Sequence, residues 1–144
     1  MVEASSRIKA RVVSQDERDT SGVRAQLNFG HTLGHALEAA TRYRRWTHGE
    51  AIAIGMCAAA DLGVEANVCA TSVRDRIVRL IQRAGLPTRA TGVSLRAVQG
   101  AMRFDKKFIH GCSRWVVPTA IGRVVVTERL SASAVQRVLR RRLA

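Results

Sequence analysis

The segment that most constrains the fold is an apolar run at residues 49–64, GEAIAIGMCAAADLGV. Its length suits a helix of several turns, and apolar side chains would lie on nearly every side of that helix. Such a helix is stable only when other elements cover it all round, so we expect it at the centre of a helical bundle. The frequent alanine, leucine, valine and arginine residues elsewhere in the chain also favour helices.

Segments before this run predict helices that would cover it. Residues 3–13 and 23–41 have helical patterns, and a polar loop at 14–22 separates them. Gly30 and Gly34 are poor helix formers within the second pattern. Their spacing indicates that a neighbouring helix or a bound ligand packs closely against that face.

The second half of the chain predicts three further helices. Ser72 with Asp75 is typical of a capping box, and Gly85 and Pro87 would close the helix that this box opens. The remaining expected boundaries are a turn at 41–47, a helix start at Ser94, and a final cap at Ser133 with Gln136.

Two β-branched runs, at 114–118 and 123–127, break the helical pattern. The residues between them include a glycine, and this arrangement predicts a short antiparallel hairpin. A chain of 144 residues without internal repeats or a linker fits one domain. We therefore predict a single, mainly α domain over residues 1–144, a helical bundle with a short antiparallel β hairpin.

The chain is strongly basic, with 24 lysine and arginine residues, 11 acidic residues and a net charge of +13. Either a solvated, arginine-rich surface or an anionic partner explains this charge, and the partner could be a small phosphorylated substrate or a nucleic acid. Nucleic acid is the less favoured partner, because the basic residues are scattered and no reader motif is present. Only the C-terminal tail, with Arg137 and residues 140–142, is a dense basic patch.

The cysteines are Cys57, Cys69 and Cys112, an odd number without the spacing of a metal site, which indicates reduced thiols. The sequence contains no stretch long and apolar enough to span a bilayer, and its first residues do not resemble a secretion signal. These features predict a cytoplasmic protein without a membrane partner.

Three of the four histidines lie between residues 24 and 50. On a helix, His31, His35 and Glu38 would share one face, and such a face can hold a divalent metal ion. His48 follows the expected turn, so an antiparallel pair of helices would bring it back beside His31. Two imidazoles alone leave a catalytic zinc site incomplete. Packed or surface histidines are the alternative explanation of this spacing.

Longer sequence blocks surround these histidines. They are residues 28–36, NFGHTLGHA, and 48–56, HGEAIAIGM, with Tyr43 between them. Shorter blocks lie at 9–13, 16–18, 85–87, 105–107 and 120–122. Together they resemble the C-terminal, metal-binding domain of the 3-dehydroquinate synthase family, and they cover nearly the whole chain. The resemblance implies the fold of that domain.

The resemblance also implies roles for the histidines. His31 and His48 match the family's metal ligands, and the metal ion would be zinc or cobalt. The family's third ligand is a glutamate in an upstream AExxK block, which this sequence does not contain, and Glu17 is the nearest carboxylate that could replace it. His35 matches a histidine that faces the substrate.

Several basic and polar residues match positions that bind the substrate's anionic groups. Arg24 and Asn28 are two of them, and on a continuous helix they would share one face with the histidines. Lys9, Lys106 and Lys107 match further anion-binding positions. For each lysine the alternative is a solvated surface charge, and which of Lys106 and Lys107 faces the substrate stays open.

In the family, NAD oxidises an alcohol of 3-deoxy-arabino-heptulosonate 7-phosphate, phosphate is eliminated, and reduction and ring closure give 3-dehydroquinate of the shikimate pathway. The family's NAD-binding domain precedes the part that this chain resembles. We therefore expect a C-terminal domain that is inactive alone, with a nucleotide-binding half or a homo-oligomer as its partner. Two alternatives stay open: a domain of another sugar phosphate cyclase, and a non-enzymatic basic helical module that binds an anionic partner.

Overall fold

The computed structural model describes residues 2–17, 22–104, 108–109, 112–113, 115–128 and 130–144, with backbone only for 103–104, 108–109 and 112–113. Its elements are α1 (Val2–Gln15), the 3-10 helix η1 (Val23–Asn28), α2 (His31–Ala40), α3 (His48–Glu65), α4 (Thr71–Arg83), α5 (Leu95–Phe104), β1 (Phe108–Ile109), β2 (Cys112–Ser113), β3 (Trp115–Ala120), β4 (Arg123–Thr127) and α6 (Ala132–Leu143). The predicted class, mainly α with an antiparallel hairpin, is confirmed. Within the described ranges, no helix combines the length and the apolarity needed to cross a membrane.

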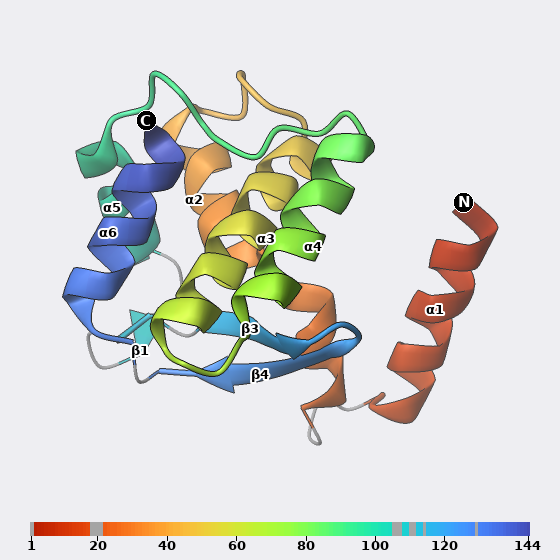
Figure 1. Cartoon of the computed structure of the whole chain (residues 1–144). Coiled ribbons are helices and arrows are strands. Elements are labelled where there is room, and N and C mark those ends of the chain that lie inside the picture. The colour runs from red at the N-terminus through yellow and green to blue at the C-terminus, as the bar shows by residue number, and fades with distance from the viewer. Residues whose placement is uncertain (1, 18–21, 105–107, 110–111, 114, 129) are drawn as a thin grey trace.

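The apolar run forms α3, which lies at the centre of the bundle as predicted (Figure 1). It contacts α2, α4, α6 and β3, so other elements cover most of its surface. Ile54 and Leu62 of α3 are fully buried and share one core cluster with Leu33 and Leu37 of α2. The other elements complete this core with Val98, Trp115, Val117, Val138 and Leu139. These contacts bury the apolar side chains on nearly every side of α3.

Strands β3 and β4 form the predicted hairpin, which lies beneath the helices in Figure 1. Trp115 pairs with Thr127 and Val117 with Val125. Gly122 turns the chain with a φ of 81°, a conformation that glycine adopts without steric cost. A second short antiparallel ladder, between β1 and β2, was not predicted.

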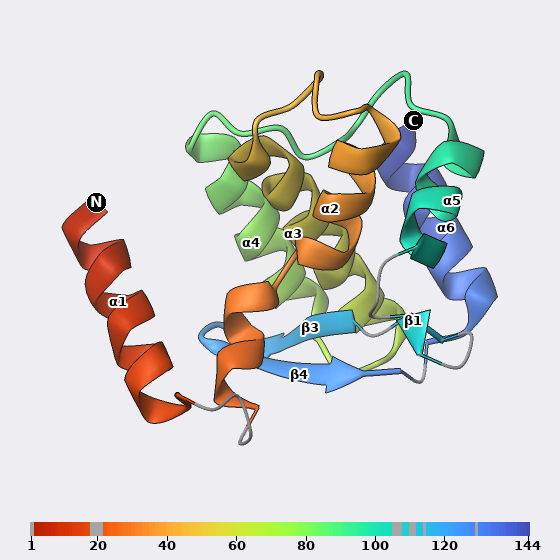
Figure 2. The ribbon, with the colours of Figure 1, turned by 180° about the vertical axis from the view of Figure 1, so that it is seen from behind.

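Helix α1 stands apart from the bundle in both views (Figures 1 and 2). It contacts η1, and its buried residue is Val12. The helix predicted over residues 3–13 is confirmed and extends to Gln15. A helix with so little burial gains little stability from packing.

The single helix predicted over residues 23–41 is wrong. The chain forms η1, breaks at Phe29 and Gly30, and starts again as α2 at His31. Gly30 has a φ of 85°, and a Cβ there would lie 2.7 Å from the carbonyl oxygen of Ile52 in α3. Glycine therefore lets the backbone leave the helical path and touch α3, and this contact outweighs the helical pattern of the sequence.

Two predicted caps are also wrong, whereas the predicted start at Ser94 is confirmed by a hydrogen bond to its hydroxyl. Helix α4 begins before Ser72, and its N-cap is Ala70, which has no side-chain cap. At α6 the cap is Ser131 and not Ser133, because the Ser131 hydroxyl accepts the backbone N–H at the third helical residue. Polar residues cluster at both starts, so the sequence pattern does not fix the helix end to within one or two residues.

A buried acidic side chain ties α3 to the C-terminal helix. The Asp61 carboxylate is fully buried and accepts hydrogen bonds from Arg142 Nε at 2.8 Å and from Arg74 Nη1 at 3.2 Å. Arg142 is also buried, and its Nη1 donates to the carbonyl oxygen of Thr88. Because buried charges are stable only when paired, this cluster joins α3, α4 and α6.

The Cys57 thiol of α3 is expected to resist alkylation in the folded protein. Its burial raises its pKa to about 11, so at pH 8 about one thiol in a thousand would be ionised, and only the thiolate reacts. Mass spectrometry after brief iodoacetamide treatment should find Cys57 unmodified in the folded chain and modified in denaturant. Equal modification under both conditions would contradict this burial.

Candidate metal and substrate site

Close packing of α2 against α3 brings the histidines together. A Cβ at Gly55 of α3 would collide with the carbonyl oxygen of Gly30 and lie 3.0 Å from the backbone nitrogen of Gly34. The sequence left open whether a helix or a ligand packs against these two glycines, and the neighbour is α3. Because these glycines carry no side chains, the two backbones approach closely, and side chains along one face of α2 can meet the first turn of α3.

Thr47 caps α3 and so places His48 in its first turn. The Thr47 hydroxyl accepts the backbone N–H of Glu50 at 3.4 Å, while the Glu50 carboxylate accepts the backbone N–H of Thr47 at 2.8 Å. The two bonds form a capping box. A threonine followed three residues later by a glutamate is the sequence signal of such a cap. The hydrogen bonds that the Thr47 backbone N–H and the Thr47 hydroxyl donate to this carboxylate hold the pKa of Glu50 below its usual value.

Three imidazole rings meet beside this cap. The ring centroids of His31 and His48 lie 5.6 Å apart, those of His31 and His35 5.2 Å, and those of His35 and His48 5.9 Å. The expected return of His48 beside His31 is therefore observed. Imidazoles contributed by two neighbouring helices are suitable ligands for a shared cation.

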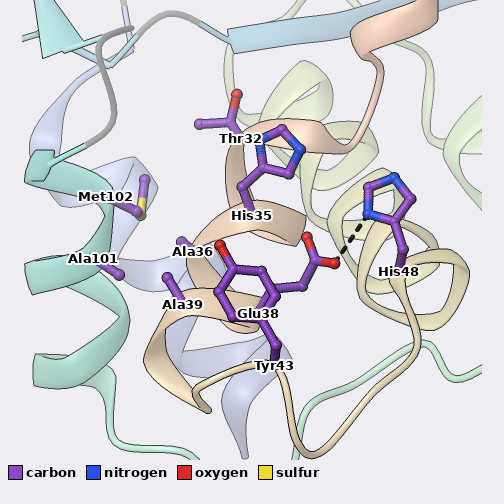
Figure 3. A pocket seen from close by; sticks show the side chains of 9 residues that line it. All are labelled: Thr32, His35, Ala36, Glu38, Ala39, Tyr43, His48, Ala101 and Met102. Carbon is purple, nitrogen blue, oxygen red and sulfur yellow. Dashed lines mark hydrogen bonds and ion pairs between the residues drawn. The ribbon is translucent and has the colours of Figure 1, made fainter.

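A buried carboxylate lies against this group of rings. Glu38 Oε1 is 3.0 Å from His48 Nδ1, and 9% of the Glu38 side chain is exposed compared with 58% of the His48 side chain. Candidate ligand atoms of His35, Glu38 and His48 all lie within 4.8 Å of one another. Figure 3 shows the side chains of these three residues turned toward the same space. Imidazole and carboxylate groups are donors that zinc and cobalt accept, so the residues present fit a divalent metal ion.

His48 stands between two hollows of different character. One, which we call the polar hollow, has a volume of about 490 Å³, and its walls combine the polar groups of Thr32, His35, Glu38, Tyr43 and His48 with apolar side chains (Figure 3). The other, of about 350 Å³, is lined mainly by apolar side chains together with His31 and His48. A small polar ligand would find hydrogen-bonding partners in the first hollow.

Arg24 and Asn28 do not share a helical face with the histidines, because the break at Gly30 separates η1 from α2. The predicted common face is therefore wrong. Arg24 Nη1 donates to the carbonyl oxygen of Glu17 at 3.3 Å, and its backbone N–H bonds to the carboxylate of Asp16 at 3.2 Å. Both Arg24 and Asn28 are partly buried, and their contacts with substrate stay predictions.

The predicted lysines are not brought to the imidazoles within the described part of the chain. Lys9 is exposed on α1, and this helix stands apart from α2 and α3 (Figure 2). Lys106 and Lys107 lie outside the described residues. Glu17, the suggested replacement ligand, is exposed, whereas the carboxylate that lies against an imidazole is that of Glu38.

Two residues of this site were only partly predicted from the sequence. Glu38 was placed on the histidine face that could hold a metal ion, three residues after His35, but its contact with His48 was not predicted. Tyr43 and its neighbour Arg42 have positive φ angles of 56° and 52°. Non-glycine residues rarely adopt this conformation, and no sequence signal predicts it here. This backbone turns the chain between α2 and α3 and places Tyr43 at the polar hollow.

Comparison with known families decides the assignment of the chain. The family model described as 3-dehydroquinate synthase C-terminal matches residues 1–108. The chain belongs to this family. The 3-dehydroquinate synthase of Picosynechococcus sp. is 45% identical over 140 residues, and that of Teredinibacter turnerae is 44% identical over 142 residues. These matches cover 96% and 98% of this chain but 38% and 39% of the relatives, so the chain spans less than half of a 3-dehydroquinate synthase.

Solved structures share the fold of this 3-dehydroquinate synthase domain at lower identity. A 2-deoxy-scyllo-inosose synthase complexed with carbaglucose-6-phosphate, NAD+ and Co2+ superposes with a TM-score of 0.69 at 23% identity, covering 81% of this chain and 34% of that one. A 2-epi-5-epi-valiolone synthase from Streptomyces hygroscopicus with NAD+ and Zn2+ bound has a TM-score of 0.68 at 20% identity, covering 79% and 31%. These two synthase structures therefore share the fold of this chain.

Proposed function

We propose that this chain is the metal- and substrate-binding part of a 3-dehydroquinate synthase, which converts 3-deoxy-arabino-heptulosonate 7-phosphate to 3-dehydroquinate and phosphate. The observation that carries the proposal is the meeting of His31 and His35 of α2 with His48 in the first turn of α3, in a chain 45% identical to a 3-dehydroquinate synthase. In this proposal NAD binds to the part of the enzyme that this chain does not span, and the chain alone is inactive.

His31 and His48 would hold the divalent metal ion, zinc or cobalt, with a third ligand from the rest of the enzyme. When bound, such an ion supplies a Lewis acid that polarises a substrate oxygen. The rings of these two histidines already lie side by side at 5.6 Å, so binding requires little reorganisation of α2 and α3. Support for the proposal also comes from the donor set, which suits both metals.

His35 is assigned to the substrate. It lines the polar hollow together with Thr32, and a neutral imidazole can take up or release a proton near neutral pH. Arg24 and Asn28, with Lys9, Lys106 and Lys107, would orient the anionic groups of the substrate, since a guanidinium can bind carboxylate or phosphate in two-point fashion. Much of their contribution to catalysis would be positioning.

A second candidate is a domain of another sugar phosphate cyclase, favoured by the fold shared with 2-deoxy-scyllo-inosose synthase. The metal-binding histidines do not separate the two candidates. Sequence identity does favour 3-dehydroquinate synthase, at 45% against 23%. The substrate therefore has to be decided by assay.

The non-enzymatic basic module loses part of its supporting feature, the arginine tail. Arg137 Nη2 lies 2.7 Å from a carboxylate oxygen of Glu65, and the hydrogen bond from Arg137 lowers the pKa of Glu65. Arg141 pairs with the same carboxylate at 3.5 Å, and Arg142 is buried against Asp61. Much of the positive charge in the tail is therefore paired with carboxylates of α3.

A chimeric enzyme tests the proposal. In it, this chain replaces the matching 140-residue segment of the Picosynechococcus 3-dehydroquinate synthase. We expect phosphate release from 3-deoxy-arabino-heptulosonate 7-phosphate, no release from glucose 6-phosphate, and no release by this chain alone. The same chimera with His48→Ala is the control and should be inactive.

Two outcomes would overturn the assignment. Release from glucose 6-phosphate without release from the heptulosonate phosphate would identify another cyclase. A chimera that folds and binds NAD but releases phosphate from neither substrate would show that this chain does not supply a working metal and substrate site.

A further inference from the structure

We propose that Glu38 is a positioning residue of the metal centre: its buried carboxylate accepts the Nδ1–H of His48 and so leaves the opposite nitrogen, Nε2, to bind the metal ion. The inference rests on the proposed function for the metal itself. It adds a residue to which the family resemblance gave no role, and it names the atom of His48 that coordinates.

The contact between Glu38 and His48 joins the two helices at the site. Glu38 lies near the end of α2 and His48 is the first residue of α3, and 3.0 Å separates Glu38 Oε1 from His48 Nδ1. The carboxylate is largely buried, and a buried carboxylate is costly unless it is hydrogen-bonded. Among the described residues, the recorded side-chain partner of this carboxylate is His48. The low local dielectric strengthens this hydrogen bond.

This contact determines which ring nitrogen of His48 is free to bind a metal ion. A neutral ring carries one proton, on Nδ1 or on Nε2, and a metal ion needs the nitrogen without it. An ionised carboxylate can only accept a hydrogen bond, so Glu38 favours the tautomer with the proton on Nδ1. Figure 3 shows one ring nitrogen of His48 facing Glu38 and the other pointing away from it. A carboxylate behind a metal-binding histidine orients the ring and raises its basicity.

The competing explanation is that Glu38 itself binds the ion, together with His35 and His48, because their ligand atoms are within 4.8 Å of one another. The substitution Glu38→Gln should affect metal binding differently if Glu38 is a direct ligand than if it is a positioning residue. The Glu38→Gln amide keeps an oxygen that accepts the Nδ1–H of His48, but it removes the negative oxygen that would coordinate a metal. Glu38→Met removes both functions at similar volume.

Nitrogen-15 NMR of histidine-labelled, metal-free chain tests the tautomer without using the metal. Spectra are recorded at increasing pH until the histidine signals no longer change, so that only neutral rings are compared. We expect His48 to be the Nδ1–H tautomer in the wild-type chain and in Glu38→Gln, and to shift toward the Nε2–H tautomer in Glu38→Met. A wild-type His48 in the Nε2–H form, or a tautomer ratio unchanged in folded Glu38→Met, would overturn the proposal even if zinc binds.

Zinc affinity then separates positioning from direct coordination. Loss of a residue behind a metal ligand costs about 10- to 100-fold in affinity, and we expect a loss of that size for Glu38→Met. Glu38→Gln should lose less than Glu38→Met, and His48→Ala should lose more than either. Equal losses for Glu38→Gln and His48→Ala would show that Glu38 is a direct ligand. If the wild-type chain binds no zinc, the proposed metal centre fails, while the tautomer measurement still decides the role of Glu38.

Discussion

Gly55→Ala should destabilise the chain by about 3 kcal/mol or more and weaken metal binding at the same time. The added Cβ would collide with the carbonyl oxygen of Gly30. It would also lie 2.9 Å from the carbonyl carbon of Gly30 and 3.0 Å from the backbone nitrogen of Gly34. These are backbone atoms, which cannot move aside as the end of a flexible side chain can. Helices α2 and α3 would have to separate, and His31 and His48 would separate with them. Chemical denaturation and zinc titration measure the two effects.

Gly100→Ala is the matched control for this substitution. Gly100 also lies inside a helix, α5, but a Cβ there would meet no atom of the described residues within 4 Å. In open space the higher helix propensity of alanine should stabilise the chain by up to about 1 kcal/mol. Similar small effects for both substitutions would contradict the close packing of α2 against α3.

Asp61→Leu should cost about 3–5 kcal/mol of folding free energy, because it leaves the Arg142 guanidinium buried without a counter-ion. The Arg142 side chain is 7% exposed and its Nε lies 2.8 Å from the Asp61 carboxylate. Removing one partner of a buried pair costs far more than the pair contributes when intact. Helix α6 should loosen first, and hydrogen exchange of its amides reports this together with the midpoint of urea unfolding.

The double substitution Asp61→Leu with Arg142→Met should recover most of the lost stability, since it leaves no buried charge of that pair. Glu65→Gln is the control for a more exposed carboxylate, which pairs with Arg137 and Arg141. It should cost no more than about 1 kcal/mol. Two results would contradict a buried ion pair between Asp61 and Arg142. One is a double variant no more stable than Asp61→Leu. The other is an Asp61→Leu variant that loses as little folding free energy as Glu65→Gln.

The architecture was predictable where the pattern of apolar and β-branched side chains allows only one arrangement of the backbone. The run at 49–64 is apolar on all sides and had to be covered, and α3 is contacted by α2, α4, α6 and β3. The β-branched runs near the C-terminus had the length and the intervening glycine of a hairpin, and β3 and β4 form it. In both cases the pattern follows from burial alone, which the sequence encodes directly.

The errors lie where a tertiary contact decides against a local pattern. A glycine costs about 1 kcal/mol in a helix, so Gly30 alone did not mark a break between 23 and 41. Its contact with Ile52 and Met56 of α3 is invisible in the local sequence, and that contact makes the break. The predicted face shared by Arg24 and the histidines depended on one continuous helix, so that prediction failed as well.

The candidate site shows the same division. The spacing of His31 and His35 and the return of His48 required only an antiparallel pair of helices, and the three rings do meet. The contact between Glu38 and His48 depends on how residues 41–47 turn. That turn uses positive φ angles at Arg42 and Tyr43, which the sequence does not signal, and Glu38 lies against His48.

Calorimetric titration of the metal-free chain with zinc is the measurement on which the metal centre depends, made with wild type, His31→Ala and His48→Ala, and with Gly100→Ala as a control. We predict weak binding of one zinc ion per chain, because two imidazoles leave a zinc site incomplete. Either histidine substitution should lower the affinity at least about tenfold, a direct ligand being worth no less than a residue behind it. No binding by the wild-type chain, or an affinity that neither histidine substitution changes, would contradict the metal centre proposed for α2 and α3.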